Sequence, residues 1–475
     1  MQTHGERIVK QQWRTGVVLT AGAGVAMMAG SALAEPFVSA DPRNLGMGGA
    51  GVAVESGVNA SVYNPALASP EIDPYRFSLN FPTVGVGVQD REEFIDAFDD
   101  FDDSNILDRT DDSFRDFNEQ FRLMRDRAED GFYQTNEQIR EDLDELEDRF
   151  DRLDGTSDEF FDLLGDMSER PLTADFRGSM GLGLRVGQWG TALHLEGRGY
   201  GGGQFVLADE DSDLVLGEID AGGEIITCFD EASQDGATPD EERLEECKDA
   251  ADLNEEISGD LTSEFQAQGA LMREIGFTLA RDFDMFGRDV SFGVTPKVVD
   301  VDTVDYNVRV QDEDDVDLSD REQSDSGFTV DVGASMMLTE DLRGGVTVRN
   351  LIPQSYGTFE GNDIDVDPQL RAGVSWQPVS PITLAADMDL TENQPVGFGA
   401  DTRFLSLGGE FDLRGIAQVR AGYRMNLASN DLVEDRASVG LGFSPGPVKI
   451  DVGAAGSSND LAFFLQTGMQ FRAGN

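Results

Sequence analysis

The sequence has 475 residues, of which 92 are acidic and 36 basic, and its formal net charge is −56. Such a chain has no basic stripe with which to displace the counterions of a nucleic acid, so we expect no nucleic-acid partner. Only four of the basic residues are lysine, and an acidic surface with little lysine is typical of proteins exposed to high salt, where screening weakens the repulsion between like charges.

The first 34 residues have the pattern of a secretory signal peptide. A basic start that includes Lys10 and Arg14 precedes an apolar stretch at 15–29, and Ala32-Leu33-Ala34 fits a signal-peptidase site, which places cleavage before Glu35. The apolar stretch is shorter than the roughly 20 residues that a membrane-spanning helix needs. We therefore expect an exported protein of the Gram-negative cell envelope.

A glycine-rich segment occupies residues 35–74. It contains Asn44-Leu45-Gly46-Met47-Gly48-Gly49-Ala50-Gly51 and, further on, Tyr63-Asn64-Pro65-Ala66. Three of its glycines formally match the dinucleotide-binding fingerprint, but that fingerprint needs a buried strand before it and a βαβ unit around it. Here the predicted signal peptide precedes the glycines, so we expect no bound nucleotide and no other cofactor.

Segments that alternate between apolar and polar residues recur from about residue 75 to the end. In one of them, Ile382, Leu384 and Met388 alternate with Thr383 and Asp387. This period of two fits an antiparallel sheet with one apolar and one polar face. The predicted strands are 75–88, 176–187, 191–207, 269–283, 289–310, 327–338, 343–350, 369–377, 380–391, 403–411, 415–426, 434–443, 447–455 and 461–471.

The connections between these fourteen strands are alternately long and short. Outer-membrane barrels have short periplasmic turns and longer outer loops, and their closure leaves no unpaired edge. After the leader, no segment is long and apolar enough for a spanning helix. The sequence therefore predicts an all-β fold, an antiparallel transmembrane β-barrel of about fourteen strands over 75–475, with both termini in the periplasm.

The polar faces of the predicted strands are rich in charge. One interpretation is a set of paired charges that fills the barrel, and the other is a lining that selects what passes; the sequence leaves both open. The charges that we expect to face the lumen are Arg185, His194, Glu196, Arg198, Lys297, Asp387, Asp389, Glu410, Arg420, Arg424, Arg436, Lys449 and Asp451.

The first long loop, 89–175, is acidic and contains two stretches whose apolar residues recur every three or four positions. Such spacing predicts two amphipathic helices, joined near Gly131 as a hairpin, and a third helix is expected around 92–101. The hairpin either packs on itself and on the barrel mouth or binds a partner. The two apolar stripes are Phe114, Phe117, Phe121 and Met124, and Ile139, Leu143, Leu146, Phe150 and Leu153.

The second long loop, 208–268, holds both cysteines, Cys228 and Cys247. In an exported protein, two cysteines this close usually form a disulfide. Closing a loop of about 20 residues would restrict the unfolded chain by roughly 3 kcal/mol.

Specific metal binding and catalysis are not expected. Acidic runs such as 312–315 could hold a calcium ion, but none has the spacing of an EF-hand loop. His194 is the only histidine after the leader, and no serine motif of a hydrolase accompanies it. We therefore predict no metal site, and a protein that is not an enzyme.

The glycine-rich segment and several strands resemble a known group of barrels. The segments that are similar to TraF-like conjugal transfer proteins are 45–50, 63–66, Pro296–Val299 with Val304–Tyr306, Arg403–Phe411, Arg420–Arg424 and Val439–Pro445. The TraF-like proteins are relatives of the FadL-like barrels, the long-chain fatty acid transporters of the outer membrane. The resemblance covers the lead-in and most strands, but not obviously the acidic loops.

The FadL-like resemblance implies fourteen strands and an N-terminal hatch within the lumen. The hatch motif would comprise Gly46, Gly48, Gly49, Gly51, Asn64, Pro65 and Ala66, with glycines for tight packing and Pro65 to fix a turn. It also implies a kink in the third strand that opens laterally to lipid. Gly199, Gly201, Gly202 and Gly203 are the candidate kink residues, although they also suit a flexible strand end.

Two departures from these families stand out. Barrels of this kind commonly end in an aromatic residue, whereas here four residues follow Phe471. The long acidic hairpin is also not a feature that the transporters require.

Three functions remain consistent with the sequence. The first is an envelope or interaction component of the conjugal-transfer type, with other envelope or conjugation proteins as partners. The second is a FadL-like passive channel for a hydrophobic ligand such as a fatty acid, which predicts an apolar pocket between the hatch and the wall. The third is a structural or adhesive barrel that displays acidic loops. All three place the mature protein in outer-membrane lipid.

Overall fold

A computed structural model describes residues 41–54, 57–73, 75–90, 93–234, 238–253, 261–285, 287–309, 322–357, 363–393, 401–428, 435–457 and 461–473. The predicted signal peptide at 1–34, the remainder of the lead-in up to residue 40, and the acidic run at 312–315 lie outside the described residues.

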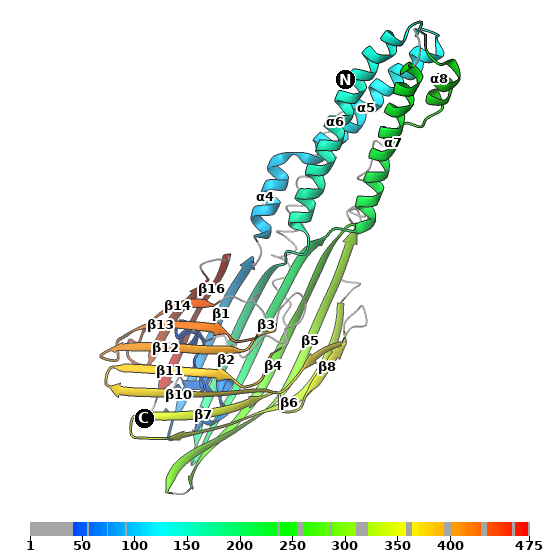
Figure 1. The fold of residues 1–475 in the computed structure, drawn as a ribbon. Helices are drawn as coiled ribbons and strands as arrows, with labels where there is room; N and C mark the ends of the chain where they lie inside the picture. Colours follow the sequence, from blue (N-terminus) through cyan, green and yellow to red (C-terminus); the bar gives the residue numbers. More distant parts are fainter. Residues whose placement is uncertain are drawn as a thin grey trace.

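Fourteen antiparallel strands form a closed barrel, in which the first strand pairs with the last (Figure 1). Each of the remaining barrel strands pairs with the barrel strands before and after it in the chain, which confirms the predicted fold. The strands are β1 (Phe77–Asp90), β2 (Leu172–Val186), β3 (Trp189–Val206), β4 (Glu264–Met285), β5 (Arg288–Arg309), β6 (Glu322–Met337), β7 (Leu342–Arg349), β10 (Gln369–Val379), β11 (Ile382–Asp389), β12 (Phe404–Leu413), β13 (Ala417–Asn426), β14 (Arg436–Phe443), β15 (Val448–Gly456) and β16 (Leu461–Ala473).

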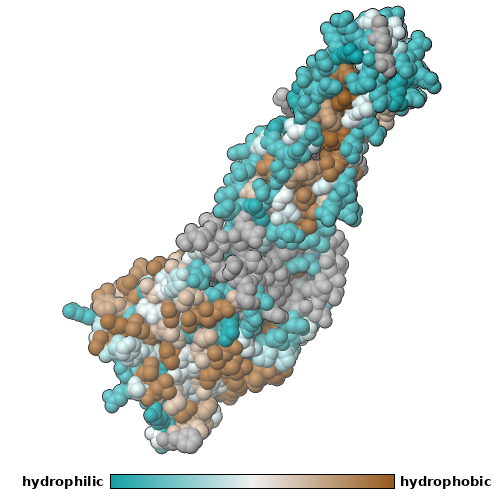
Figure 2. Space-filling view, viewed as in Figure 1, coloured by the Kyte–Doolittle hydropathy of each residue, from teal (hydrophilic) through white to brown (hydrophobic). Residues whose placement is uncertain are grey.

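The alternation along each strand separates a lipid-type surface from a polar interior. On β14, Val439, Leu441 and Phe443 are exposed, whereas Gly440 and Gly442 between them are buried. The same division holds around the barrel, whose outer face is largely hydrophobic (Figure 2). Because the sheet closes on itself, backbone donors and acceptors in this surface find partners within the protein.

The barrel wall is taller on the side of β4 and β5. Each of these strands has 22 residues, or about 70 Å of extended chain, whereas the apolar band of such barrels is about 25 Å tall. On β5 the apolar outward positions run up to Val298 and are followed by Asp300 and Asp302. This side of the wall therefore continues beyond the apolar band.

Five helices continue the structure beyond this tall side, and we call them the helical projection (Figure 1). They are α4 (Phe94–Ser104), α5 (Ile106–Glu129), α6 (Asn136–Met167), α7 (Asp209–Gln234) and α8 (Glu241–Lys248). The two predicted apolar stripes are buried in one common core, so the predicted helical hairpin is confirmed. Gly131 has a φ of +67° in the turn between α5 and α6, and a capping box of Thr135 and Gln138 begins α6.

The sequence analysis predicted no helix in the loop at 208–268, but the structure has one there. Helix α7 has 26 residues and buries Val215, Ile219, Ile225 and Phe229 against the core shared with α5 and α6. The sequence analysis missed it because Gly217, Gly222 and Gly223 interrupt the pattern. Glycine is unfavourable inside a helix by about 1 kcal/mol, so tertiary packing stabilises this one.

Two contacts hold α7 in place. The predicted disulfide is confirmed: Cys228 of α7 and Cys247 of α8 are joined with an S–S distance of 2.04 Å. At the other end, Asp211 accepts hydrogen bonds from the backbone N–H groups of Thr262 and Ser263, both at 2.7 Å. Burial alone would raise the pKa of Asp211, but the hydrogen bonds from Ser263 and Thr262 offset this and lower it.

The glycines of the third strand do not interrupt it. β3 pairs with β2 from Trp189 to Gly203, and with β4 from Trp189 to Val206, without a shift in register. The candidate kink residues Gly199, Gly201, Gly202 and Gly203 each have a partner on both neighbouring strands, and a kink that opens laterally to lipid stays a prediction. The register shifts instead in β1 between Asn80 and Thr83, where Pro82 has no N–H to donate.

The remaining elements are short. α2 (Pro42–Gly46), η1 (Gly57–Asn59), α3 (Ala60–Tyr63) and η2 (Pro65–Ala68) belong to the N-terminal segment, and β8 (Gln354–Gly357) pairs with β9 (Asp363–Val366) in the connection after β7. Among the described helices, none has the length and hydropathy to cross a bilayer.

Most of the core of the helical projection comes from its own helices, and Phe205 of β3 joins it at the base. Phe117 is fully buried, with its ring 6.0 Å from that of Phe150. We expect Phe117→Ala to destabilise the projection by about 3–5 kcal/mol. Hydrogen exchange of α5 and α6 should therefore accelerate, while the barrel keeps its resistance to unfolding by heat in detergent.

Leu216→Ala is the matched control, because the side chain of Leu216 is 54% exposed and its loss should change stability by less than about 0.5 kcal/mol. Unfolding of the barrel together with the projection in Phe117→Ala would contradict the independence of the two parts.

Candidate functional site

The N-terminal segment, residues 41–73, lies within the barrel (Figure 1). Nearly all of its residues are buried, including Leu45, Met47, Val54 and Tyr63. The first helix, α2, contacts β13 to β16, and η2 contacts β3 to β6 on the other side. A single short segment thus touches the wall around much of the circumference.

Glycines of the wall allow the N-terminal segment to approach the strands closely. A Cβ atom added to any of them would meet an atom of this segment, as for Gly408 with Met47, Gly422 with Gly48 and Gly345 with Val52. We call this set the glycine belt, and all its members have the inward orientation on their strands. They are Gly181 and Gly183 of β2, Gly190 of β3, Gly293 of β5, Gly333 of β6, Gly345 of β7, Gly408 of β12, Gly422 of β13, Gly440 of β14 and Gly453 of β15.

The glycines of the predicted hatch motif belong to the N-terminal segment itself. Gly46 faces Gly440 so closely that an added Cβ would be 2.8 Å from its Cα, and a Cβ on Gly51 would meet Tyr63 and Asn44. Gly48 and Gly49 have φ values of +68° and +89°, which side chains disfavour. The glycines are thus required by close approach and by backbone conformation, not by a phosphate.

Asn64 organises the second part of the motif. Its side-chain Nδ2 donates to the backbone oxygen of Val52 at 2.9 Å and to that of Ala334 in β6 at 3.2 Å. Its Oδ1 accepts from the N–H of Ala66 at 3.0 Å, and Pro65 begins the turn of η2. This buried amide therefore joins two parts of the N-terminal segment to the wall.

Charged side chains of the wall bind the N-terminal segment directly. Asp387 accepts hydrogen bonds from the N–H groups of Gly51 and Val52 at 2.6 and 2.9 Å. Arg43 donates to both carboxylate oxygens of Glu410, at 2.9 and 2.7 Å. Such charge-assisted and bidentate contacts are among the stronger hydrogen bonds in proteins.

These contacts continue into further pairs on the wall. Arg420 lies between Glu410, at 2.6 Å, and Asp451, at 2.7 Å. Lys449 is 3.3 Å from Asp451, and Asp389 pairs with Arg371. The predicted lumen residues Asp387, Asp389, Glu410 and Arg420 therefore lie inside, in contact with opposite charges or with backbone donors.

A second group of buried charges lies on β3 to β7. Lys297 is 3.0 Å from Glu274 and 3.1 Å from Asp331, Arg198 pairs with Glu274, and Arg349 is 3.5 Å from Glu274 and 3.8 Å from Glu196. Three cations and three anions thus neutralise one another, as buried charges require. His194, also predicted for the lumen, lies beside this group next to Gly276.

The sequence analysis placed Arg185 in the lumen as well. It has the inward orientation of β2 but is exposed, because it lies at the end of the strand beyond the N-terminal segment. The analysis also missed Arg43, Glu274, Asp331, Arg349 and Arg371. The last four occupy inward-facing positions of their strands, so the alternation of residues along those strands could have indicated them. Arg43 precedes the first strand, where no such alternation applies.

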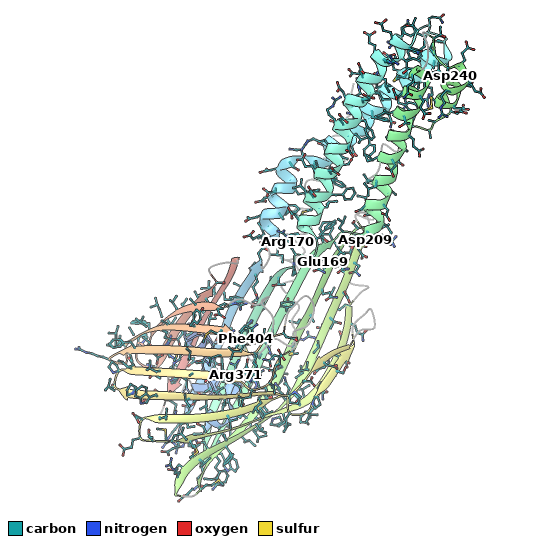
Figure 3. The ribbon with its side chains drawn as sticks, in the orientation of Figure 1. Glu169, Arg170, Asp209, Asp240, Arg371 and Phe404 are labelled. Carbon is teal, nitrogen blue, oxygen red and sulfur yellow. A yellow bond between two sulfur atoms is a disulfide. The ribbon has the colours of Figure 1, made fainter. Side chains whose placement is uncertain are left out.

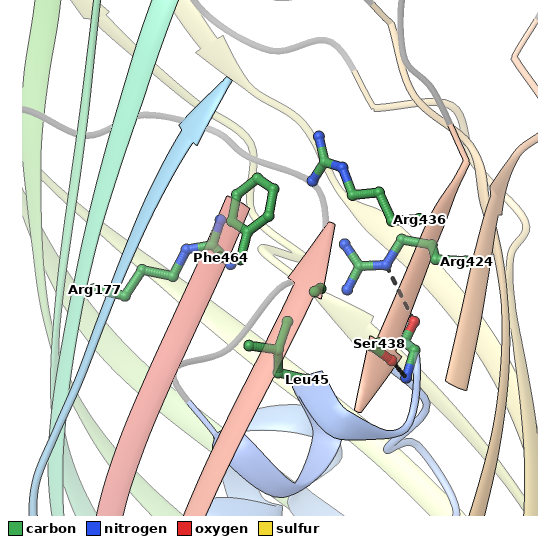
Figure 4. Close-up of a pocket in the computed structure, with 8 residues that line it drawn as sticks. Leu45, Arg177, Arg424, Arg436, Ser438 and Phe464 are labelled. Carbon is green, nitrogen blue, oxygen red and sulfur yellow. Dashed lines mark hydrogen bonds between the residues drawn. The ribbon is translucent and has the colours of Figure 1, made fainter. Parts of the chain in front are cut away.

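A small cavity remains between the N-terminal segment and the wall (Figure 4). Its volume is about 20 Å³, which is room for about one water molecule. Its lining residues are Leu45, Gly48, Arg177, Arg424, Arg436, Ser438, Ala455 and Phe464. The cavity is too small for a hydrocarbon ligand, and three of its eight lining residues are arginines.

In the described ranges, no three His, Cys, Asp or Glu side chains converge on a point where a metal ion could bind. Figure 3 labels Asp240 near the far end of the helical projection and Glu169, Arg170 and Asp209 at its base, and the three acidic residues among them are exposed.

The chain is similar in sequence to one protein family and in fold to several solved structures. The profile of the family described as "F plasmid transfer operon, TraF, protein" matches residues 61–389. This range includes both long connections that carry the helices, which the resemblance noted in the sequence analysis did not obviously cover. No curated protein matches the chain by sequence.

Solved structures with a similar fold include the toluene transporter TbuX of Ralstonia pickettii, at 11% identity and a TM-score of 0.50, over 92% of this chain and 100% of that chain. The toluene transporter TodX of Pseudomonas putida aligns at 9% identity and a TM-score of 0.43 over 93% and 99% of the two chains. A FadL homologue of Pseudomonas aeruginosa aligns at 9% identity and a TM-score of 0.44, over 93% of this chain and 99% of that chain. The first similarity shows a shared fold, and the identities are too low to transfer a substrate.

The glycine belt yields a direct test of how tightly the N-terminal segment fits. In Gly422→Val the new side chain would collide with the backbone of Met47 and Gly48, and overpacking of this kind costs about 1–3 kcal/mol or more. We expect the segment to leave its place. A cysteine introduced by Met47→Cys should then react with a polar maleimide in Gly422→Val, but not in the otherwise unchanged protein.

Gly197→Val is the control, since nothing lies within 4 Å of a Cβ at this position of β3. Equal protection of the cysteine in Gly422→Val and in Gly197→Val would show that the belt does not set the position of the segment.

Proposed function

The chain belongs to the F plasmid transfer operon TraF protein family, and from that premise we propose that it is an outer-membrane anchor for a partner-binding helical projection. This membership and the shared transporter fold confirm the resemblance noted from the sequence. In this proposal the barrel holds the projection at the membrane, and the projection, rather than the lumen, carries the function.

The observation that carries the proposal is the charge and construction of the helical projection. The connections 91–171 and 207–263 hold 49 acidic and 12 basic residues, which is most of the negative charge of the chain. A shared hydrophobic core and a disulfide support them. A rigid acidic surface of this kind suits a basic partner protein, because complementary charge accelerates encounter and excludes wrong partners.

The filling of the barrel supports the same view. The N-terminal segment packs against the glycine belt, and buried ion pairs occupy the lumen on both sides of it. A large rearrangement would break several charge-assisted contacts at once, each worth about 1.5–3 kcal/mol. In this proposal the N-terminal segment is a fixed plug, and the long connections lie outside the cell, as in other outer-membrane barrels.

Removing the projection tests the proposal. In a variant with 93–167 and 209–253 replaced by short Gly/Ser linkers, we expect the barrel to assemble and to keep its heat-resistant form in detergent gels. The basic partner is first identified by cross-linking the intact protein in cell envelopes. We expect the variant without the projection to lose binding to this partner. For the intact protein, we expect this binding to weaken with added salt.

A variant that replaces only residues 363–366 by Gly/Ser is the control, because it changes another long connection and leaves the helices intact. Unchanged cross-linking after removal of the projection would contradict the proposal.

A second candidate is passive transport of a hydrophobic molecule, and the fold shared with the toluene transporter TbuX favours it. The cavity of about 20 Å³ beside the N-terminal segment is too small to hold such a molecule. We expect liposomes that contain the protein to take up a hydrophobic dye no faster than protein-free liposomes. Deletion of residues 41–73 should open the lumen and increase the ion conductance of the bilayer.

Dye uptake by the complete protein that is lost on deletion of residues 41–73 would instead support a gated channel. Dye uptake and partner binding are separate measurements, so each candidate can fail without the other.

A further inference from the structure

An open recess lies on the outer face of the barrel, at the end where the connections between strands are short. It is lined by Val186, Trp189, Thr191 and Leu279 and has a volume of about 290 Å³. These residues occupy outward-facing positions of β2, β3 and β4. The hydroxyl of Thr191 donates to the backbone oxygen of Leu184 at 2.9 Å, so the surface that the recess offers to a ligand is largely apolar.

A cation lies at the edge of this recess. Arg281 of β4 pairs in register with Trp189, one of the lining residues, and shares the outward orientation of Phe283. Its Cζ atom lies 5.4 Å from the ring centre of Trp189 and 5.4 Å from that of Phe283. Its Nη2 donates to the side chain of Gln188 at 2.6 Å. Two rings and one amide therefore position the guanidinium before any ligand binds, which reduces the ordering cost of binding.

The charge of Arg281 has no anionic partner in the part of the chain that the structure describes. Asp282, the next residue, has the opposite orientation on β4 and accepts a hydrogen bond from the hydroxyl of Ser291 at 2.5 Å. Gln188 uses one of the five N–H donors of a guanidinium. Donors of Arg281 therefore remain for an acceptor from outside the protein.

The recess continues into the lipid-facing surface of the barrel. Leu193 and Phe277 pair in register next to it and are 44% and 45% exposed. Rings such as those of Trp189 and Phe283 are typical of the boundary between the apolar band and water. A ligand that contacts both Arg281 and the recess must carry an anionic group at this boundary and an apolar chain that lies along the wall.

We propose that Arg281 and the recess bind one anionic glycerophospholipid, such as phosphatidylglycerol. Its phosphate accepts hydrogen bonds from Arg281, and the first part of an acyl chain occupies the recess. A net negative headgroup is favoured over a zwitterionic one, because a cation in the headgroup offsets the attraction to Arg281. The site lies at the opposite end of the barrel from the helical projection (Figure 1), so it is independent of the function proposed above.

Tryptophan fluorescence provides the test, because Trp189 lines the recess and the only other tryptophan after the predicted leader is Trp376. The mature chain carrying Trp376→Phe is reconstituted in phosphatidylcholine bilayers. Phosphatidylglycerol or phosphatidylcholine with brominated acyl chains, which quench tryptophan on contact, is then added in increasing shares. We expect brominated phosphatidylglycerol to bind beside Trp189 about fivefold more strongly, since one arginine near a membrane surface attracts an anionic lipid to about this extent.

Arg281→Gln should remove this preference. Arg414→Gln is the matched control, because it removes an exposed arginine from the short connection between β12 and β13 and should leave the preference unchanged. In Trp189→Phe the remaining Trp376 should show no preference, since its Nε1 donates to the carboxylate of Asp341 at 2.8 Å.

Equal quenching of Trp189 by the two brominated lipids in the protein that keeps Arg281 would overturn the proposal, and this criterion needs no variant of the site. A preference that survives in Arg281→Gln, or one of the same size at Trp376, would overturn it as well.

Discussion

The whole structure depends on the closure of the barrel between β1 and β16. In lipid, an unpaired backbone N–H or C=O costs several kcal/mol, so a sheet can cross a membrane only if it has no edge. Closure in turn divides every strand into lipid-facing and inward-facing residues. The apolar outer surface and the charged interior of this chain are two consequences of that single constraint.

An interior formed in this way must be filled and neutralised. The N-terminal segment fills it at backbone distance, which is why glycines of the wall face glycines of the segment, as Gly440 faces Gly46. The inward charges are neutralised in two groups, one around Glu410 and Arg420 and the other around Glu274 and Lys297. Removal of a single partner would leave a buried charge uncompensated, so the filled interior is stable only while its charges remain paired.

The helical projection satisfies a different requirement. It lies beyond the tall side of the wall, where β5 carries Asp300 and Asp302 on its outer face instead of apolar residues, and water there satisfies its acidic surface. Its stability comes from a core formed mainly by its own helices, together with Phe205 of β3, and from the Cys228–Cys247 disulfide. The chain thus places its largely apolar outer surface in the membrane and most of its negative charge outside it.

The sequence by itself determined the fourteen strands, the alternation of long and short connections, the helical hairpin around Gly131, and the disulfide. Each of these leaves a periodic or short-range pattern along the chain. Only the tertiary structure decided which inward charges pair, as with Arg43 and Glu410 across 367 positions, and that the glycines of β3 leave its pairing unbroken. It also decided that α7 is a helix despite its three glycines. Such features depend on contacts between residues far apart in the chain, and those contacts exist only once the barrel has closed around the N-terminal segment.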